Sequence, residues 1–319
     1  MLMSADRINE LCEKFCLATA SGTYSAESQQ HRLLENGIAF HELEYDALMT
    51  SIIGLSKVLI RPGLNTVIDF DHYALWGWCG ELLLGPMAQI KIHNNQLMQH
   101  EINDLYQTCL RSALANCERP SHPEVDREVK RQNLIRSAMN PDGGERLKSS
   151  SHMILAYLAF PLLEANLKQI ASEFVGLDSV VIKDFTRLSK KDNICTQHAG
   201  TEISSLKILL NLVYDHVATP DLKSLIDEFR FHLNEVSGKS DAFELIYKWR
   251  CESLHGNTNF PTIGGVILNF CLLLSIFKIK DEFASYQTDA NMTWRLSLQR
   301  NMTQDNFYPP ACFLNPIQL

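Results

Sequence analysis

The stretch YKWRCESLHG, residues 247–256, is the part of the sequence that most restricts the fold. Apolar residues recur with a helical period before it, and Gly256 follows His255 where a helix commonly ends. A long apolar run, residues 260–277, comes shortly afterwards. The pattern predicts a helix that ends near His255, followed by a second, buried helix.

Arg250 and His255 are candidate catalytic residues within this stretch. Five residues of helix separate them by a rise of about 7.5 Å and a rotation of about 140°, so they do not share one face. The long arginine side chain can still bring its guanidinium beside an imidazole one turn further on. The negative end of the helix dipole favours a charged imidazole at His255. A histidine there can exchange protons near neutral pH, and an arginine can bind a phosphate through two hydrogen bonds.

Helical periodicity continues through most of residues 151–285, which predicts an antiparallel bundle of four to five helices. Pro161 lies inside the first helix and should kink it or start a new one, because proline lacks a backbone donor. Thr219 and Pro220 are typical of a helix start, as is Ser240 or Asp241. The predicted helices span residues 153–174, 202–216, 221–236 and 262–280, with one more from about residue 241 to 255.

The run 260–277 has 18 residues without a charge and is therefore a candidate membrane span. Gly264, Gly265 and Asn269 dilute its first half, so only residues 266–277 are strongly apolar. These twelve residues fall short of the roughly 20 that a bilayer requires. We expect a helix buried in a protein core.

The rest of the chain mixes patterns. Residues 5–19, 28–60 and 102–117 have helical spacing, whereas the short apolar and alternating runs of residues 65–101, with Gln89–Asn95 as their clearest strand and turn, predict a small antiparallel sheet or hairpin. The predicted class is mainly α. Its parts are a mixed α/β regulatory or sensor region (1–118), a charged linker (119–150), the helical bundle (151–285) and a C-terminal tail (286–319).

Composition limits the function classes. The chain has 319 residues, enough for two domains, and a net charge of −8 argues against a protein that coats nucleic acid over its whole surface. Nine cysteines form no dense disulfide framework, and the N-terminus does not resemble a signal peptide. We expect a cytoplasmic protein with reduced thiols and no membrane association.

With an R-x4-H pair before a glycine late in a bundle, residues 151–285 resemble a HEPN domain. The resemblance implies a homodimer in which two such motifs face one cleft and cleave RNA without a metal, the 2′-hydroxyl attacking the adjacent phosphate to leave a cyclic phosphate. It also implies that His255 is the general acid and base. Arg250 would stabilise the charge that develops on the phosphate.

Three further residues bear on this resemblance. Glu164 and Lys168 are similar to the E-x3-K element that accompanies the motif in some HEPN families, although an exposed i,i+4 ion pair is the alternative. Cys251 follows the arginine where active members commonly carry Asn, Asp or His. A thiol is a weak hydrogen-bond donor, so Cys251 would position the arginine or the phosphate less well.

Basic residues in two groups are candidate RNA contacts, with a solvated helix face as the alternative. The groups are Lys183, Arg187, Lys190 and Lys191, and Arg127, Lys130, Arg131 and Arg136.

Other clusters carry less chemistry. The pairs Cys12 with Cys16 and Cys195 with His198 lack the second half that zinc requires, so we expect no metal, and no other cofactor is implied. The sequence places Asp69, Asp71 and His72 near two tryptophans, Trp76 and Trp78. The first three residues are a candidate acid and base cluster, with the edge of a half-buried strand as the alternative.

The resemblance therefore implies a metal-independent endoribonuclease, and the composition predicts a cytoplasmic one. By resemblance, such proteins often act as toxins or in defence against phage, so the expected partners are RNA, a second copy and an antitoxin or regulatory protein. One alternative is a non-catalytic dimerisation or interaction module in which Cys251 marks a lost active site. Another is a nucleotide- or ligand-binding protein that works through the region near Trp76 and Trp78.

Overall fold

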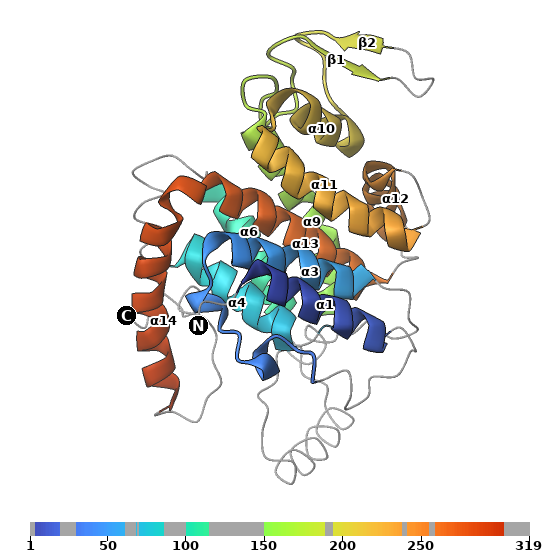
Figure 1. Cartoon of the computed structure of the whole chain (residues 1–319). Coiled ribbons are helices and arrows are strands. Elements are labelled where there is room, and N and C mark those ends of the chain that lie inside the picture. Colours follow the sequence, from blue (N-terminus) through green and yellow to red (C-terminus); the bar gives the residue numbers. More distant parts are fainter. Residues whose placement is uncertain are drawn as a thin grey trace, which may run out of the picture.

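The computed structural model is mainly helical, with one small two-stranded antiparallel sheet (Figure 1). This confirms the mainly α class. The structure describes residues 4–19, 30–60, 68, 70–85, 100–114, 150–188, 194–237, 241–254 and 259–302. The predicted charged linker, residues 119–150, lies outside this description except for its last residue.

The N-terminal region consists of helices and short 3-10 turns where it is described. The helix predicted over residues 5–19 is α1 (Ala5–Thr19). Residues 28–60, which were predicted to be helical, form two 3-10 turns and one α-helix where they are described. The helix predicted over residues 102–117 is present and begins two residues earlier. These elements are η1 (Leu34–Asn36), η2 (Phe40–Glu42), α3 (Tyr45–Ile60) and α6 (His100–Leu114).

The predicted sheet over residues 65–101 is wrong for the described part of that segment, which forms α4 (Phe70–Leu84). Trp76 and Trp78 are both fully buried, and so are most of the residues around them. A helix that is covered on nearly all sides has no polar face and so shows no helical periodicity in its sequence. Residues 89–95, which carried the hairpin pattern, lie outside the described residues.

The two strands lie instead within the part of the chain that was predicted to be helical almost throughout. Strands β1 (Phe185–Leu188) and β2 (Ile194–Gln197) pair in antiparallel register, with Phe185 opposite Gln197. They are four residues each, and β2 is largely exposed, so no long apolar alternation marks them in the sequence. Figure 1 shows them at one end of the molecule, beyond α10.

The predicted helices after residue 150 are present with shifted ends. The first, α9, is a single element with Pro161 inside it, so the proline does not start a new helix. The helix predicted over residues 202–216 is shorter and continues as a π-helical turn. In chain order the elements are α9 (Ser151–Ile170), α10 (Leu206–Leu212), the π-helical turn η3 (Val213–Val217), α11 (Pro220–Ser237), α12 (Ala242–Leu254) and α13 (Phe260–Lys278).

The expected C-terminal tail begins inside a helix. After the short 3-10 turn η4 (Lys280–Glu282), α14 (Phe283–Met302) continues well beyond residue 286. Phe283, Tyr286 and Ala290 are buried, which gives this helix an apolar side. The spacing of these residues follows a helical period, so the first half of the predicted tail belongs to the fold.

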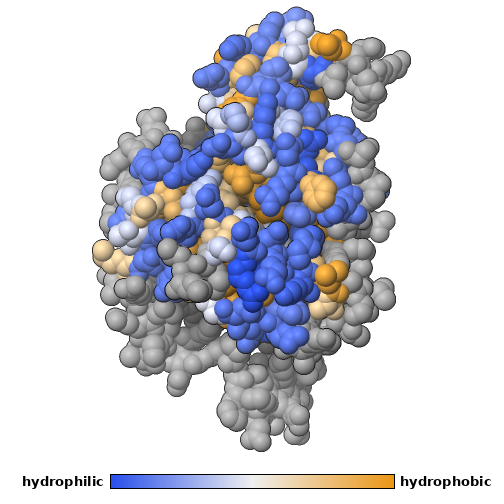
Figure 2. Space-filling view, viewed as in Figure 1, coloured by the Kyte–Doolittle hydropathy of each residue, from blue (hydrophilic) through white to orange (hydrophobic). Residues whose placement is uncertain are grey.

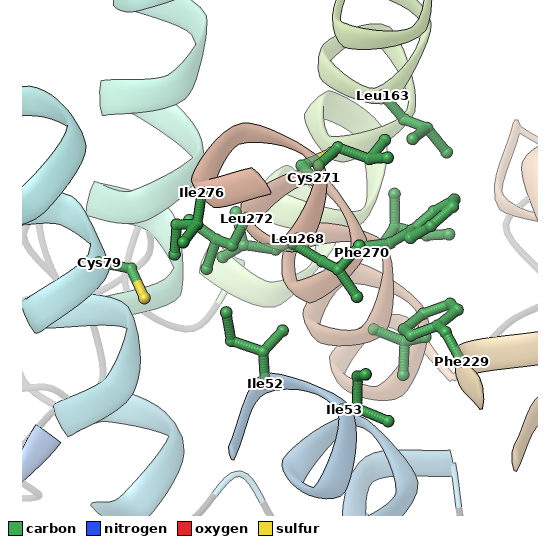
Figure 3. Packing of buried hydrophobic residues seen from close by; sticks show 14 of the residues in the cluster. Ile52, Ile53, Cys79, Leu163, Phe229, Leu268, Phe270, Cys271, Leu272 and Ile276 are labelled. Carbon is green, nitrogen blue, oxygen red and sulfur yellow. The ribbon is translucent and has the colours of Figure 1, made fainter. Parts of the chain in front are cut away.

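Helix α13 lies at the centre of the hydrophobic core and packs against α9, α3 and α4 (Figure 3). The ring of Phe270 stacks on that of Phe229 from α11, with centroids 4.6 Å apart. Among the described residues α13 is the one helix long and apolar enough to span a membrane. Of the 18-residue stretch of this helix that is most apolar, 83% is buried inside the fold. Burial of this extent is typical of a core helix.

Glycines let α13 approach its neighbours closely. A Cβ atom added to Gly264 would lie 2.9 Å from the backbone nitrogen of Ala156 on α9. A Cβ atom on Gly265 would lie 2.7 Å from Leu59 on α3. Helices from both sides of the 119–150 segment therefore share one core around α13.

Candidate functional site

Helix α12, which carries Arg250, is fixed at its start by ionic and capping contacts. Asp241 accepts a hydrogen bond at Oδ1 from the backbone nitrogen of Phe243, at 3.0 Å, and so caps the helix as the sequence predicts. Lys207 on α10 bridges Asp241 and Glu244 at 2.9 and 2.7 Å. These contacts tie the first turn of α12 to α10.

The buried side of α12 faces the helices that hold it. Ala242, Phe243, Leu245 and Ile246 are buried, and α12 contacts α9, α10 and α11. The last turns carry Arg250, Cys251 and Glu252, which are only half-buried. A rigid, partly covered helix of this kind can position an arginine side chain.

Arg250 forms an ion pair with Glu164 on α9. Its Nη2 lies 2.8 Å from Oε1 of Glu164, and the two side chains are 30% and 23% exposed. The structure thus brings together two residues that the sequence analysis singled out in separate elements, 86 positions apart. A guanidinium has five N–H donors in one plane, so it can contact a phosphate while a carboxylate holds its orientation.

His255 and Gly256 lie outside the described residues. Helix α12 ends at Leu254, immediately before His255. The placement of His255 at a helix C-terminus and beside Arg250 therefore stays a prediction.

Lys168 does not join the pair at Arg250. Its Nζ donates to the backbone oxygen of Leu177 at 3.1 Å, while the ion pair of Glu164 is made with Arg250. An i,i+4 ion pair between Glu164 and Lys168 is therefore not the arrangement that α9 adopts. Of the E-x3-K element, the glutamate alone contacts the arginine.

Cys251 contacts a phenol one helical turn earlier. A hydrogen bond between Tyr247 and the Cys251 thiol raises the pKa of Tyr247. On the exposed side of the same helix, Lys248 and Glu252 form an i,i+4 ion pair at 3.0 Å. The surroundings of Arg250 on α12 are thus a thiol and a phenol in addition to the carboxylate from α9.

The basic residues singled out as RNA contacts lie elsewhere where they are described. The Lys183 ammonium lies over the ring of Phe174, 4.8 Å from its centroid. Arg187 on β1 donates to Gln197 on β2 at 3.3 Å. Arg187 therefore lies on the strand pair at one end of the molecule (Figure 1), and Lys183 precedes β1 by two residues. Lys190, Lys191, Arg127, Lys130, Arg131 and Arg136 lie outside the described residues.

Asp71 and His72 serve the packing of the core and contact different neighbours. Asp71 accepts hydrogen bonds from the backbone nitrogens of Leu33 and Leu34, at 2.6 and 3.1 Å, and so holds the start of η1. The Nε2 of His72 lies 3.1 Å from the backbone oxygen of Leu55. Both residues are buried on α4, so the strand edge suggested as an alternative is wrong, and Asp69 lies outside the described residues.

The cysteine pairs are placed as follows. Cys12 and Cys16 are buried in α1, and Cys195 is half-buried on β2. His198 lies 3.0 Å from Asp184, whose pKa is lowered by hydrogen bonds from the Ala199 backbone and from His198. Within the described ranges no three His, Cys, Asp or Glu side chains come together as metal ligands.

No family model, curated protein or solved structure matches this chain.

Proposed function

We propose that the protein is a metal-independent endoribonuclease of HEPN type, working in the cytoplasm as a homodimer through Arg250 and His255. The observation that supports this most is the half-buried ion pair between Arg250 and Glu164. It gives the arginine a fixed orientation at a partly exposed position, which is what phosphate recognition requires. A role as a toxin or antiphage effector, with an antitoxin or regulatory partner, belongs to the same proposal.

In this mechanism a base, His255, takes the proton from a ribose 2′-hydroxyl. The 2′-oxygen then forms a bond to the adjacent phosphorus, and the bond from phosphorus to the 5′-oxygen of the next nucleotide breaks. The leaving oxygen receives a proton from an acid, which in a dimer can be the second copy of His255. Arg250 binds the phosphate oxygens as their charge increases, and Glu164 acts as a positioning residue.

Incubation of the full chain with mixed tRNA and single-stranded RNA in EDTA tests this proposal. We expect wild type to leave fragments that end in a cyclic phosphate, and Arg250→Ala and His255→Ala to lose cleavage by at least a hundredfold. Lys248→Ala is the matched control, because it removes a basic residue from the exposed side of the same helix. Cleavage that persists in His255→Ala, or that depends on a divalent cation, would overturn the proposal.

The role of Glu164 can be separated from a purely structural one. Glu164→Gln keeps the shape of the side chain but removes the charge that holds Arg250. We expect a folded, dimeric protein with a lower rate of cleavage at saturating RNA, and partial recovery in Glu164→Asp. An unchanged rate would remove Glu164 from the mechanism while leaving Arg250 and His255 to be judged by their own variants.

A second candidate, a non-catalytic dimerisation or interaction module, is favoured by two observations. Cys251 stands where active members commonly carry a polar residue, and Arg250 is already paired with a carboxylate. A folded dimer, shown by light scattering, that cleaves none of the RNAs even when Cys251 is replaced by Asn would support this candidate.

A further inference from the structure

A cavity of about 930 Å³ opens where the ends of α9 and α13 meet the start of α11. This size is within the range of small-molecule sites, about 300–1,000 Å³. Neither Arg250 nor Glu164 lines the cavity, so it is distinct from the ion pair that supports the proposed nuclease site. The face of the molecule in Figure 2 is mainly hydrophilic, with apolar side chains gathered near its middle.

The walls of the cavity combine apolar side chains with amino groups. Val217, Leu222 and Phe277 supply apolar surface from η3, α11 and α13. The charged residues that line it are Lys168 from α9, Asp221 from α11, Lys278 from α13, and Lys280 and Asp281 from η4.

Lys278 differs from the other two lysines in its partner. Lys280 is paired with Asp221 at 2.6 Å, and Lys168 donates to the Leu177 carbonyl. Lys278 donates to the neutral side-chain amide oxygen of Gln169, at 2.9 Å. Among the described residues no carboxylate forms an ion pair with Lys278.

Burial makes this arrangement unfavourable for a charged amine. Loss of solvent lowers the pKa of Lys278 to about 8, so the amine is still mostly protonated at pH 7. A half-buried ammonium without a counter-ion is stabilised when an anion binds beside it. Lysines in the last turn of a helix often bond the free carbonyls there, but Lys278 donates to a side-chain amide instead.

We propose that this cavity binds a small organic anion, with its apolar body against Val217, Leu222 and Phe277 and a single phosphate or carboxylate group at Lys278. The two aspartates in the lining disfavour ligands that carry several separate anionic groups. A polyanion such as RNA is therefore disfavoured as the occupant, and the site goes beyond the proposed nuclease activity. A ligand bound here would stabilise the contacts among α9, α11 and α13.

Binding of phenyl phosphate, benzoate and phenol to the full chain, by calorimetry and by thermal unfolding, tests this proposal. We expect the two anions to bind and to raise the midpoint of unfolding at pH 7, and phenol to bind at least tenfold more weakly. Lys278→Met should weaken both anions at least tenfold, and Lys278→Arg should retain them. Lys248→Met is the matched control because it removes the same charge from the exposed side of α12, outside the cavity, and it should change the affinities less than twofold.

Raising the pH from 7 to 9 should weaken benzoate binding in wild type, because Lys278 loses its proton while benzoate stays ionised. The proposal is overturned if neither anion binds, if phenol binds as tightly as phenyl phosphate, or if Lys278→Met binds the anions as wild type does. Cleavage of RNA is not measured in this experiment, so its failure leaves the nuclease proposal to its own test.

Discussion

Trp76 on α4 donates its indole N–H to Oδ1 of Asn269 on α13 at 2.6 Å, across 193 positions of sequence and in a fully buried part of the core. The amide of Asn269 in turn donates to Oγ of Ser56 on α3 at 3.0 Å. One buried side chain thus connects three helices that otherwise meet through apolar contacts. A buried polar network of this kind specifies how the helices align, because a shift would leave its members without partners.

Replacing Asn269 by Leu should lower the free energy of unfolding by about 2–4 kcal/mol, since a buried N–H left without an acceptor costs roughly 1–3 kcal/mol and a second bond is lost. Urea unfolding measures this loss. Trp76→Phe removes the same hydrogen bond from the other side. The double variant should cost clearly less than the sum of the two single ones, and strict additivity would contradict the coupling.

Gly264→Ala should destabilise the fold by roughly 1–3 kcal/mol, because the new Cβ would press on the Ala156 backbone. The sign matters, since alanine at an exposed helical glycine would instead gain about 1 kcal/mol. Denaturant unfolding shows whether Gly264→Ala lowers or raises the free energy of unfolding. Gly264→Val should cost more than Gly264→Ala, whereas an alanine variant as stable as wild type would show that α9 and α13 can separate at this point.

Lys278→Met should stabilise the protein at pH 7 by roughly 1–3 kcal/mol, because each pKa unit of the buried amine corresponds to about 1.4 kcal/mol. Below pH 8 the folded and unfolded states are both protonated, and the cost of burying the charge is fully present. From pH 8 to 10.5 the folded state releases its proton first, so the stability of wild type rises with pH. The difference in the free energy of unfolding between Lys278→Met and wild type should therefore shrink toward pH 10. Denaturant unfolding at several pH values measures it. A difference that stays constant with pH would show that the buried charge is not its cause.

Half-buried cysteine thiols should react faster than fully buried ones. Burial raises the pKa of Cys12, Cys79, Cys109 and Cys271, and thiolate is the reactive form. Cys195 and Cys251 are half-buried, so iodoacetamide should label them first among the cysteines that the structure describes. Peptide mass mapping over time checks this order, with urea-unfolded protein as the control in which all of these sites react.

The helices with one exposed face were the predictable part of the fold. Residues 5–19 form α1, and α11 begins at Pro220 as the Thr219-Pro220 pair indicates. Helix α4 could not be found by periodicity because it is covered on nearly all sides. The short strands were missed because exposed strands of four residues leave no apolar run.

The site was predictable only in part. Spacing alone cannot show that Arg250 meets Glu164, because the two lie on different helices, and only the family resemblance drew attention to Glu164. Lys278 was not singled out at all. Its signal in the sequence is the first charge after an apolar run, and the significance of that charge depends on how α9 and α11 enclose it.

The central position of α13 has a consequence for the synthesis of the chain. Helices α3 and α9 are synthesised before residue 260. Their apolar faces that pack against α13 therefore stay uncovered until α13 has left the ribosome. Folding of the core therefore cannot be completed while synthesis is still upstream of α13, although N-terminal parts of proteins generally fold first. A nascent chain paused before residue 260 should bind chaperones and be digested rapidly by proteases, and both should cease once α13 has emerged.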